Sequence, residues 1–557
     1  MIKFNDVSFE YSDGRKILKN INLEIKDGEV ILLCGESGCG KSTLIRLING
    51  LIPNYYQGKL SGQILVNEVD TQKAPLYRLA EEVASVFQNP KTQFYNVDST
   101  EEMVFSLENR GTSREEMKTR LESTVKKLRM ENLLGRNLFR MSGGEKQKVA
   151  CACADTSDAP VIVLDEPSSN LDLHSIRELA QIISQWKKDG KTIIVAEHRL
   201  YYMLPFADRV LYLKDGQIQM ECTAEELKKL GKEKLEEHGL RSTDIYKLEL
   251  KEPHLTGSEK IELTNFRYVY PGSLQPTLDI ENVKISRNAV IGVVGDNGAG
   301  KSTFARALCG FERAASGGLT IEGTTFARRK RLRKTFMVMQ DVGHQLFCDE
   351  VQEELKACID EAEAEETSEA KIKNILERLN LLDKAERHPH SLSGGEKQRV
   401  AIGSAVISNR EIIVFDEPTS GLDYRHMKRV AQLIRELKEN GKTIFLITHD
   451  PELIAQCCDE LMYMQNGKVL EYGKLTRASY NRWLLRTSTY KQKKIIDNEN
   501  TSSLRRLWQL AKKEHPRLIT SIILALIGVL GSVLPFVAAG KVLEALIAGE
   551  KKSAALP

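Results

Sequence analysis

The amino-acid sequence predicts an α/β protein in which one kind of domain occurs twice. A glycine-rich loop of the form G-x-x-x-x-G-K-[ST] occurs as GESGCGKST at 35–43 and as GDNGAGKST at 295–303. Each loop follows a short apolar run and precedes a segment with helical periodicity, which is the context of a phosphate-binding loop between a strand and a helix. Further motifs recur in the same order at an offset of 251 residues, so the two halves are repeats.

Each copy contains the same series of expected elements. An alternating pattern predicts an opening strand, and a continuous apolar run before each loop predicts a buried parallel strand. A helix follows each loop, the charged middle of each copy has helical periodicity, and a second apolar run ends in Asp-Glu. In chain order these elements lie at 1–11, 29–35, 41–50, 99–140 and 161–167 in the first copy, and at 260–270, 289–295, 301–310, 349–390 and 412–418 in the second.

Composition limits the class of protein. A chain of 557 residues is too long for one core and predicts three or four domains. The net charge of +3 gives no general indication of nucleic-acid binding. The ten cysteines form no C-x-x-C pair, so we expect reduced thiols in the cytosol and no zinc ribbon or disulfide framework. The N-terminus lacks the apolar core of a secretory signal.

The two glycine loops predict two ATP sites. Glycine lets backbone N–H groups curl around phosphates, and the N-terminus of the following helix adds partial positive charge. The lysine of the motif is expected to reach the β- and γ-phosphates, and the serine to ligate Mg²⁺. The residues expected to bind nucleotide are Gly35, Gly38, Gly40, Lys41, Ser42 and Thr43 in the first loop, and Gly295, Gly298, Gly300, Lys301, Ser302 and Thr303 in the second.

Two acidic pairs at strand ends complete the predicted chemistry. Asp165 and Asp416 end apolar runs and are expected to help hold Mg²⁺ together with the loop serines. Glu166 and Glu417 follow directly, and at the end of a strand such a side chain can turn toward the γ-phosphate. There it would polarise or deprotonate the attacking water.

Residues 1–480 resemble two complete cassettes of the ATP-binding cassette ATPases. The most specific resemblance is the signature, MSGGEKQK at 141–148 and LSGGEKQR at 392–399, in which glutamate replaces the usual glutamine. The resemblance implies a mixed-sheet core plus a helical subdomain in each cassette, and an intramolecular head-to-tail cassette dimer. The signature of one cassette would cap the γ-phosphate held by the other. The residues implied are Ser142, Gly143 and Gly144, and Ser393, Gly394 and Gly395.

Other family positions carry over one residue at a time. Tyr11 and Tyr270 match the aromatic residue that stacks on adenine, although both could be packing residues. The family's Mg²⁺- and water-contacting glutamine corresponds to Gln88 and Gln340, its γ-phosphate-contacting histidine to His198 and His449, and its loop that crosses the cassette interface to 168–172 and 419–423.

The segments after the two glutamines resemble the energy-coupling-factor ATPases. A second glutamine follows five residues later at Gln93 and Gln345, and AEHRLYYM at 196–203 is similar to a further pattern of that group. This resemblance implies uptake of a vitamin or metal ion at the cytoplasmic face of a bacterial cell membrane. It also implies a transmembrane scaffold subunit, whose amphipathic coupling helix binds near the glutamine loop, and a substrate-binding membrane subunit. No nucleic-acid partner is expected.

The C-terminal part has a different character. Residues 518–540 contain no charge and would span about 34 Å as a helix at about 1.5 Å per residue, which is enough to cross a bilayer. Basic residues precede this span, which predicts that both cassettes are cytoplasmic. Residues 504–557 resemble the elbow helix and first membrane helix of an ABC exporter, so we expect a truncated chain or the beginning of a fused exporter. The predicted boundaries are 1–235 and 259–480 for the cassettes, with linkers at 236–258 and 481–503.

Two other functions are alternatives for a chain with two cassettes. A soluble tandem-cassette ATPase that acts on the ribosome or on DNA would also carry two cassettes in one chain, although usually with a longer, basic, helical linker. A regulatory pair that binds nucleotide without hydrolysing it is disfavoured by the intact glutamates Glu166 and Glu417.

Overall fold

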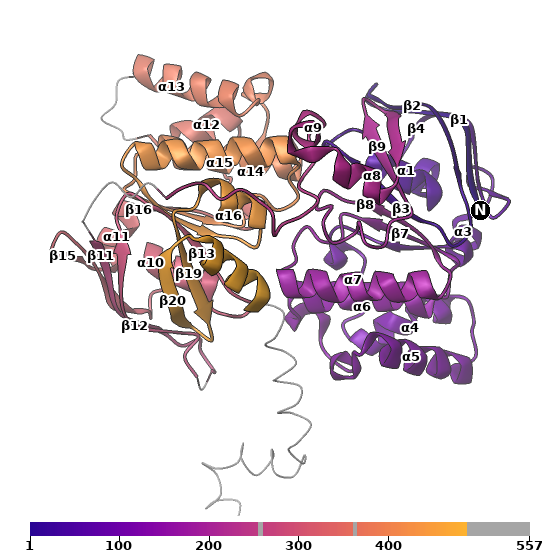
Figure 1. Ribbon diagram of the computed structural model, residues 1–557, viewed down its shortest axis with the longest axis horizontal. Helices are drawn as coiled ribbons and strands as arrows, with labels where there is room; N and C mark the ends of the chain where they lie inside the picture. Colours follow the sequence, from indigo (N-terminus) through magenta and orange to yellow (C-terminus); the bar gives the residue numbers. More distant parts are fainter. Residues whose placement is uncertain (254–259, 274, 360–364, 487–557) are drawn as a thin grey trace, which may run out of the picture. The chain divides into compact units, whose positions relative to one another are not determined.

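The computed structural model describes residues 1–253, 260–273, 275–359 and 365–486. Residues 1–487 form one compact unit that includes both copies (Figure 1). The expected membrane span at 518–540 lies outside the described residues. Within the described ranges, no helix is both long enough and apolar enough to cross a membrane.

The predicted opening strand of each copy forms, and it belongs to a four-stranded antiparallel sheet. Its strand order is β2-β1-β4-β5 in the first copy and β12-β11-β14-β15 in the second. The strands are β1 (Ile2–Tyr11), β2 (Lys16–Ile25), β4 (Gly58–Val66), β5 (Val69–Asp70), β11 (Lys260–Tyr268), β12 (Leu278–Ser286), β14 (Ser316–Ile321) and β15 (Thr324–Phe326).

A six-stranded mixed sheet forms the centre of each copy, in the orders β10-β9-β3-β8-β7-β6 and β16-β17-β18-β13-β19-β20. Neighbouring strands of each sheet pair in parallel, except at one edge. There β10 pairs with β9, and β20 with β19, in antiparallel orientation. The strands of the first copy are β3 (Val30–Gly35), β6 (Val83–Val86), β7 (Val161–Asp165), β8 (Thr192–Ala196), β9 (Arg209–Lys214) and β10 (Gln217–Cys222). Those of the second are β13 (Val290–Val294), β16 (Thr335–Val338), β17 (Ile412–Asp416), β18 (Thr443–Ile447), β19 (Glu460–Gln465) and β20 (Lys468–Lys474).

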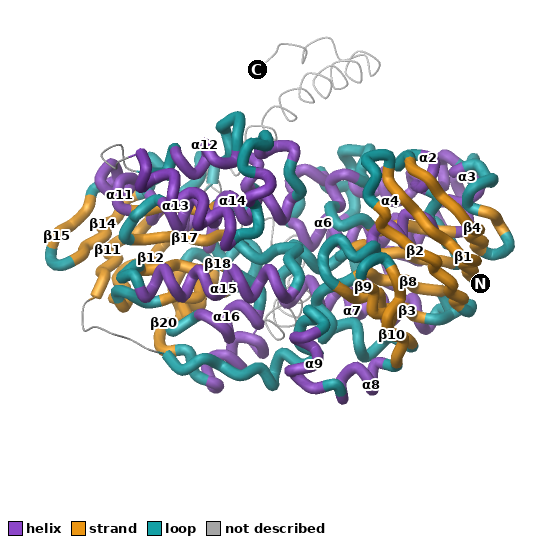
Figure 2. The backbone as a smooth tube through the Cα atoms, turned by 90° about the horizontal axis from the view of Figure 1, so that it is seen from above, coloured by secondary structure: helices purple, strands orange, loops and turns teal. Residues whose placement is uncertain are grey.

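Helices form layers against these sheets (Figure 2). The helices of the first copy are α1 (Lys41–Ile48), α2 (Leu51–Asn54), α3 (Leu76–Glu82), α4 (Ser99–Asn109), α5 (Arg114–Leu128), α6 (Gly143–Thr156), α7 (Leu173–Lys188), α8 (Ala224–Lys229) and α9 (Gly231–Glu237). Those of the second are α10 (Lys301–Cys309), α11 (Arg328–Lys334), α12 (Val351–Lys356), α13 (Glu365–Arg378), α14 (Gly394–Ile407), α15 (Tyr424–Glu439) and α16 (Pro451–Cys457). Residues 477–486 are also helical.

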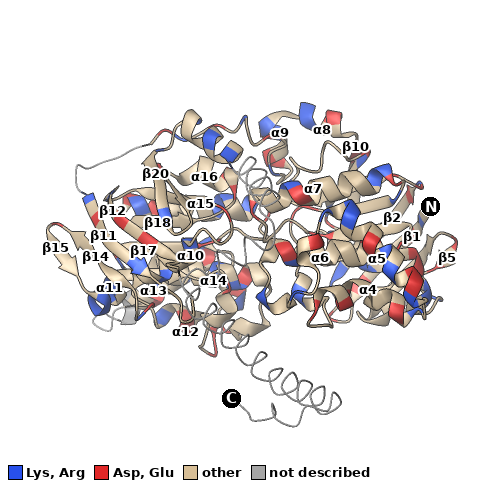
Figure 3. Ribbon diagram, turned by 90° about the horizontal axis from the view of Figure 1, so that it is seen from below, with Lys and Arg blue, Asp and Glu red and all other residues tan. Residues whose placement is uncertain are grey.

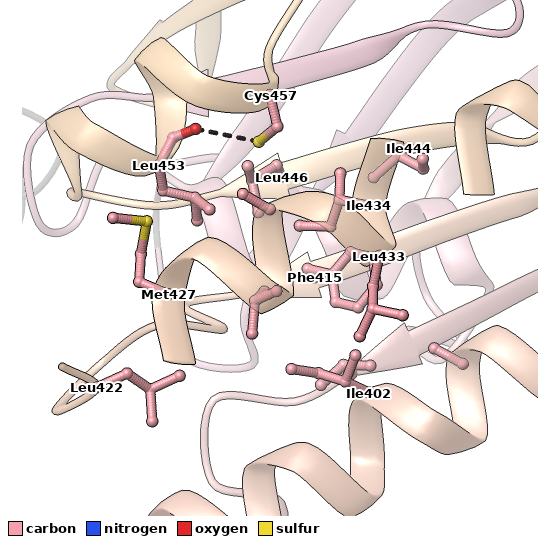
Figure 4. Packing of buried hydrophobic residues seen from close by; sticks show 14 of the residues in the cluster. Ile402, Phe415, Leu422, Met427, Leu433, Ile434, Ile444, Leu446, Leu453 and Cys457 are labelled. Atoms are coloured by element: carbon pink, nitrogen blue, oxygen red, sulfur yellow. Dashed lines mark hydrogen bonds between the residues drawn. The ribbon is translucent and has the colours of Figure 1, made fainter. Parts of the chain in front are cut away.

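The central strands are apolar throughout because both of their faces are buried. In β17, Ile412 and Val414 pack in one hydrophobic core with α10, whereas Ile413 and Phe415 pack in another core with α14 and α15. Figure 4 shows Phe415 in this second core, beside residues of α15 and β18. The successive side chains of one strand therefore attach the phosphate-loop helix to one face of the sheet and the signature helix to the other.

The segment expected as a linker is packed against the second copy. Ile245 lies in the core of that copy, and its carbonyl accepts a hydrogen bond of 3.1 Å from the Tyr480 hydroxyl. The backbone N–H of Lys251 donates to the Ala455 carbonyl at 3.0 Å. The connecting segment, defined here as residues 238–253, therefore has a fixed path over the second copy.

Replacing Phe415 by alanine should lower the free energy of unfolding by about 3–5 kcal/mol, since the ring is fully buried and its loss leaves a cavity. Phe347 is 83% exposed, so Phe347→Ala is the matched control and should change stability little. Urea unfolding followed by circular dichroism measures both effects. Equal losses for the two variants would contradict this account of the core.

Candidate nucleotide sites

The two glycine loops have the backbone geometry of a phosphate cradle. Gly40 and Gly300 precede α1 and α10 with φ of 113° and 95°, a conformation that L side chains rarely adopt. A Cβ atom added to Gly300 would lie 2.7 Å from the carbonyl oxygen of Thr277. Neither helix has a side-chain cap at its N-terminus. The first N–H groups of both helices are therefore left to bind an anion.

The lysine of each loop lies within its own cradle. Lys41 Nζ donates to the carbonyl oxygens of Gly35 and Glu36, both at 2.9 Å. Lys301 Nζ makes the corresponding contacts in the second loop, at 2.7 Å to Gly295. The ammonium groups thus already lie where the loop would surround a phosphate chain.

Each loop serine lies near the aspartate expected to share a cation with it. The Ser42 hydroxyl donates to Asp165 Oδ1 at 2.8 Å, and Ser302 and Asp416 line one cavity at the second loop. Burial, together with the neighbouring charge of Glu166, raises the pKa of Asp165 to about 6, and burial also raises that of Asp416. This donor set fits Mg²⁺, which the serine and aspartate of each site would hold and which would supply the positive charge that these buried carboxylates need.

The two glutamates turn away from their strands through unusual backbone angles. Glu166 and Glu417 follow β7 and β17 with φ of 42° and 52°, in the left-handed region that non-glycine residues seldom occupy. Their N–H groups still pair with the adjacent strand, at 2.9 Å to Ala196 and Ile447. This positive-φ turn, at a cost of order 1–3 kcal/mol in backbone strain, ends the strand and directs each carboxylate away from it.

Neighbouring side chains favour the ionised form of Glu166. Gln88 Nε2 donates to Glu166 Oε2 at 2.7 Å, and His198 Nε2 lies 3.2 Å from Oε1. Burial alone would raise the pKa of Glu166, but the neighbouring His198 and Lys41 side chains lower it below the usual value. The first site therefore brings together its predicted glutamate, glutamine and histidine.

Glu417 has a different environment. Its Oε2 accepts 3.3 Å contacts from the Thr448 hydroxyl and the His449 backbone N–H, while His449 Nε2 lies 3.7 Å from Oε1. Burial and the neighbouring Asp416 charge raise the pKa of Glu417 to about 7. Burial and the Lys301 charge keep the pKa of His449 far below its usual value, so the imidazole is neutral.

Residues of both copies line the cavity at the second loop. This cavity has a volume of about 180 Å³. The residues of the second copy that line it are Lys301, Asp416, Glu417, Gln340 and His449. The first copy contributes Ser169, Asn170 and Leu171. The second site is therefore composite.

The loops at 168–172 and 419–423, here called the crossing loops, contact the opposite phosphate loops reciprocally. Asp423 Oδ2 accepts from the Ser37 backbone N–H at 2.9 Å, and Asp172 Oδ2 accepts from the Asn297 backbone N–H at 3.1 Å. The Ser420 hydroxyl joins the two crossing loops by donating to the Ser169 carbonyl at 2.7 Å. The sequence placed these loops at the interface but did not single out the aspartates.

Those aspartates also begin α7 and α15. Asp172 accepts from the Ser175 N–H at 2.7 Å, and Asp423 from the His426 N–H at 2.9 Å. An aspartate directly before a helical pattern is a typical N-cap, and that signal could have identified both residues.

Comparison with known proteins agrees with this geometry. A family model described as ABC transporter matches residues 18–169 and 278–420. A Treponema denticola protein named as an ABC transporter ATP-binding protein is 39% identical over 477 residues, covering 85% of this chain and 96% of the relative. This chain belongs to the ABC transporter family. It is an ATPase of that family, and each copy is an ATP-binding cassette.

More distant proteins share the tandem arrangement. A Methanosarcina mazei ABC transporter ATP-binding protein is 30% identical over 533 residues, covering 85% of this chain and 89% of the relative. The solved complex of the archaeal ribosome recycling factor aABCE1 with the ribosomal stalk protein aP1 aligns with a TM-score of 0.60 at 23% identity. That match covers 86% of this chain and 92% of the other, and it shows a common fold.

The signature serines of the two cassettes begin the helices α6 and α14. Ser142 Oγ accepts from the Glu145 N–H at 3.3 Å, and Glu145 Oε2 accepts from the Ser142 N–H at 2.8 Å. Ser393 and Glu396 form the same capping box. Among the described residues lining the cavity at Lys301, the first cassette is represented by its crossing loop and not by its signature. Capping of the γ-phosphate by the signature stays a prediction.

The two predicted adenine-stacking tyrosines lie beside the phosphate-loop helices. The hydroxyls of Tyr11 and Tyr270 lie 3.2 Å from the hydroxyls of Thr43 and Thr303, respectively. Each ring also packs edge-on against an aromatic neighbour of the same strand region. Both tyrosines are thus placed at the sites and also contribute to packing, and stacking on adenine stays a prediction.

Glu166→Gln and Glu417→Gln should shift the pH dependence of stability in opposite directions. In the folded state the pKa of Glu417 is about 7, against 4.5 for the free side chain, so the wild type loses stability as pH rises through this window. Glu417→Gln removes that loss and should gain relative to wild type from about pH 5 to about pH 8. The lowered pKa of Glu166 means that its stabilisation is present at neutral pH and lost as pH falls, so Glu166→Gln should cost most near neutrality.

Thermal unfolding of both variants without nucleotide or Mg²⁺, at several pH values, measures these shifts. The two variants are matched controls for each other because they make the same substitution at equivalent positions. Parallel pH profiles would contradict the assigned environments.

Proposed function

We propose that ATP hydrolysis at two composite sites between the cassettes drives transport of a small solute across a membrane. The observation that carries this proposal is the reciprocal contact of each crossing-loop aspartate, Asp172 and Asp423, with the phosphate loop of the other cassette. Neither site is enclosed by one cassette alone, so ATP binding stabilises the paired cassettes, and product release lets them separate. A membrane partner can couple its own conformational change to this alternation between paired and separated cassettes.

In the proposed reaction, Glu166 and Glu417 orient and polarise the attacking water at their own sites. Gln88 and His198 hold the Glu166 carboxylate, which keeps it ionised and able to accept a proton. At the second site the raised pKa of Glu417 places its ionisation near neutral pH in the nucleotide-free protein. Lys41 and Lys301 balance the charge of the phosphates.

We further propose that the chain is the ATPase of an energy-coupling-factor transporter that takes up a vitamin or a metal ion. The second glutamines support this proposal, because Gln93 Oε1 accepts from the Phe87 N–H at 3.2 Å and Gln345 Oε1 from the Met339 N–H at 3.0 Å. They hold the segments that follow Gln88 and Gln340. Large apolar side chains next to them are exposed, as a docking site for a coupling helix requires. These are Tyr95, Val97 and Phe347.

The proposed partners are a transmembrane scaffold subunit and a substrate-binding membrane subunit, with the cassettes at the cytoplasmic face of the membrane. The names of the relatives from Treponema and Methanosarcina support a transporter. A fused exporter would instead use the C-terminal segment 504–557, as its sequence resemblance implies.

The alternative from another class is a tandem-cassette ATPase that acts on the ribosome or on DNA. The fold shared with aABCE1 is the observation that favours it. Basic and acidic residues are interspersed over most of the described elements, although α11 is strongly basic (Figure 3). Such mixed charge argues against an extended phosphate-binding face.

Glu166→Gln and Glu417→Gln should each abolish Mg²⁺-dependent hydrolysis at their own site while nucleotide stays bound, and the double variant should be inactive. The reason is that glutamine cannot accept the proton of the attacking water. Phosphate release and nucleotide retention measure the two properties, with Glu115→Gln as a control at an exposed position of α5. Unchanged turnover in the double variant would exclude both glutamates as catalytic.

Purification of the full chain from detergent extracts should recover membrane subunits in fixed stoichiometry, with ATP turnover that depends on them. Sedimentation of the same extract tests the ribosome alternative directly. Co-sedimentation with ribosomes after high-salt washing, without membrane subunits, would replace the transport proposal.

A further inference from the structure

A buried arginine holds the crossing loop of each cassette by a backbone carbonyl. In the first cassette, Arg199 Nη1 donates to the Leu171 carbonyl at 3.3 Å and to the Ser168 carbonyl at 3.0 Å. In the second cassette, Arg241 Nη2 donates to the Leu422 carbonyl at 2.8 Å. Leu171 and Leu422 are equivalent positions, since they are separated by the repeat offset of 251 residues.

The two arginines come from different parts of the chain. Arg199 directly follows His198 within the first cassette, and the equivalent position of the second cassette is Asp450. An aspartate cannot donate to a carbonyl. Arg241 belongs to the connecting segment, and its Nη1 donates to Asp450 Oδ2 at 2.7 Å. The connecting segment thus supplies the donor that the second cassette lacks at this position.

Burial makes this arrangement rigid. Arg241 is 2% exposed, and Asp450 is also buried. Asp450 Oδ2 accepts a further hydrogen bond of 3.0 Å from the Thr419 hydroxyl of the crossing loop, and a second buried carboxylate, Glu452, lies 3.7 Å from Arg241 Nη1. A planar guanidinium can serve the carbonyl and the carboxylate together, which a single ammonium cannot do in the same geometry.

The crossing loop that Arg241 holds belongs to the second cassette but reaches the first site. Asp423 binds the Ser37 N–H of the first phosphate loop. A Cβ atom added to Gly421 would lie 3.3 Å from Gln88 Nε2 and 3.8 Å from Glu166 Oε2. Movement of this loop by even a small distance would therefore alter the surroundings of the first-site glutamate.

We propose that Arg241 is a positioning residue for hydrolysis at the first ATP site. The connecting segment sets the second crossing loop against Glu166 and Gln88, whereas Arg199 does the same for the second site from within the first cassette. The second crossing loop is thus held by a residue of the connecting segment, whereas the first crossing loop is held by a residue of the first cassette itself. Because this inference rests on the two-site mechanism proposed above, its test must separate the sites.

The test measures phosphate released in a single turnover by chains in which one site is disabled. In the Glu417→Gln background, where only the first site hydrolyses, Arg241→Lys should lower the rate about 10-fold with ATP affinity nearly unchanged. In the Glu166→Gln background the same substitution should have little effect. Arg199→Lys should show the opposite pattern.

Arg477→Lys is the matched control for a general effect of loosening the segment. Arg477 Nη1 donates to the Tyr246 carbonyl of the connecting segment at 3.3 Å, and its guanidinium lies outside the crossing loops. It should leave the rate unchanged in both backgrounds. Should Arg241→Lys fail to fold, Asp450→Asn weakens the same anchor while keeping the arginine, and it should lower the first-site rate alone.

Three outcomes discriminate the hypotheses. Losses confined to the first site support the positioning role of Arg241. Equal losses in both backgrounds, or an equal effect of Arg477→Lys, would overturn it and leave the two-site mechanism in place. Absence of any phosphate release from the Glu417→Gln chain itself would overturn the separate action of the two glutamates, and this inference with it.

Discussion

At each candidate nucleotide site, a backbone N–H of one phosphate loop donates a hydrogen bond to an aspartate of the other cassette. Asp172 and Asp423 each use one carboxylate oxygen for this contact and the other to cap the helix that follows. Burial opposes their ionisation, but the N–H groups that donate to them keep the pKa of both below the usual value. One ionised side chain therefore couples the start of a long helix to the cradle of the opposite site.

The two sites share their plan but differ in their electrostatics. Both glutamates have positive φ, so the same strained turn re-aims the carboxylate in each cassette. Gln88 and His198 lie close to the Glu166 carboxylate, whereas the groups that contact the Glu417 carboxylate lie farther from it. The pKa of Glu417 is about 7. The two cassettes thus share the backbone turn that aims the glutamate. Side chains at the ends of neighbouring strands determine the pKa of each glutamate.

The connecting segment is a structural component of the cassette interface. Ile245 lies in the core of the second cassette, and Arg241 joins the buried carboxylate of Asp450 to the crossing loop. Loss of Arg241 would leave the Asp450 carboxylate buried without its ion-pair partner, which is strongly destabilising, so the segment is held at this point. Relative motion of the cassettes must accommodate this anchor.

The sequence by itself determined the repeat, the strand–loop–helix order, the α/β class and which residues are expected to form each phosphate cradle, because these follow from local periodicity and from contiguous motifs. The resemblance to the ATP-binding cassette ATPases also implied that 168–172 and 419–423 meet the opposite cassette. Only the tertiary structure decided that Asp172 and Asp423 make the crossing contacts, that Glu166 and Glu417 differ in pKa, and that Arg241 substitutes for a donor absent at Asp450. These properties depend on burial and on distances between residues far apart in the chain, and no local pattern carries that information.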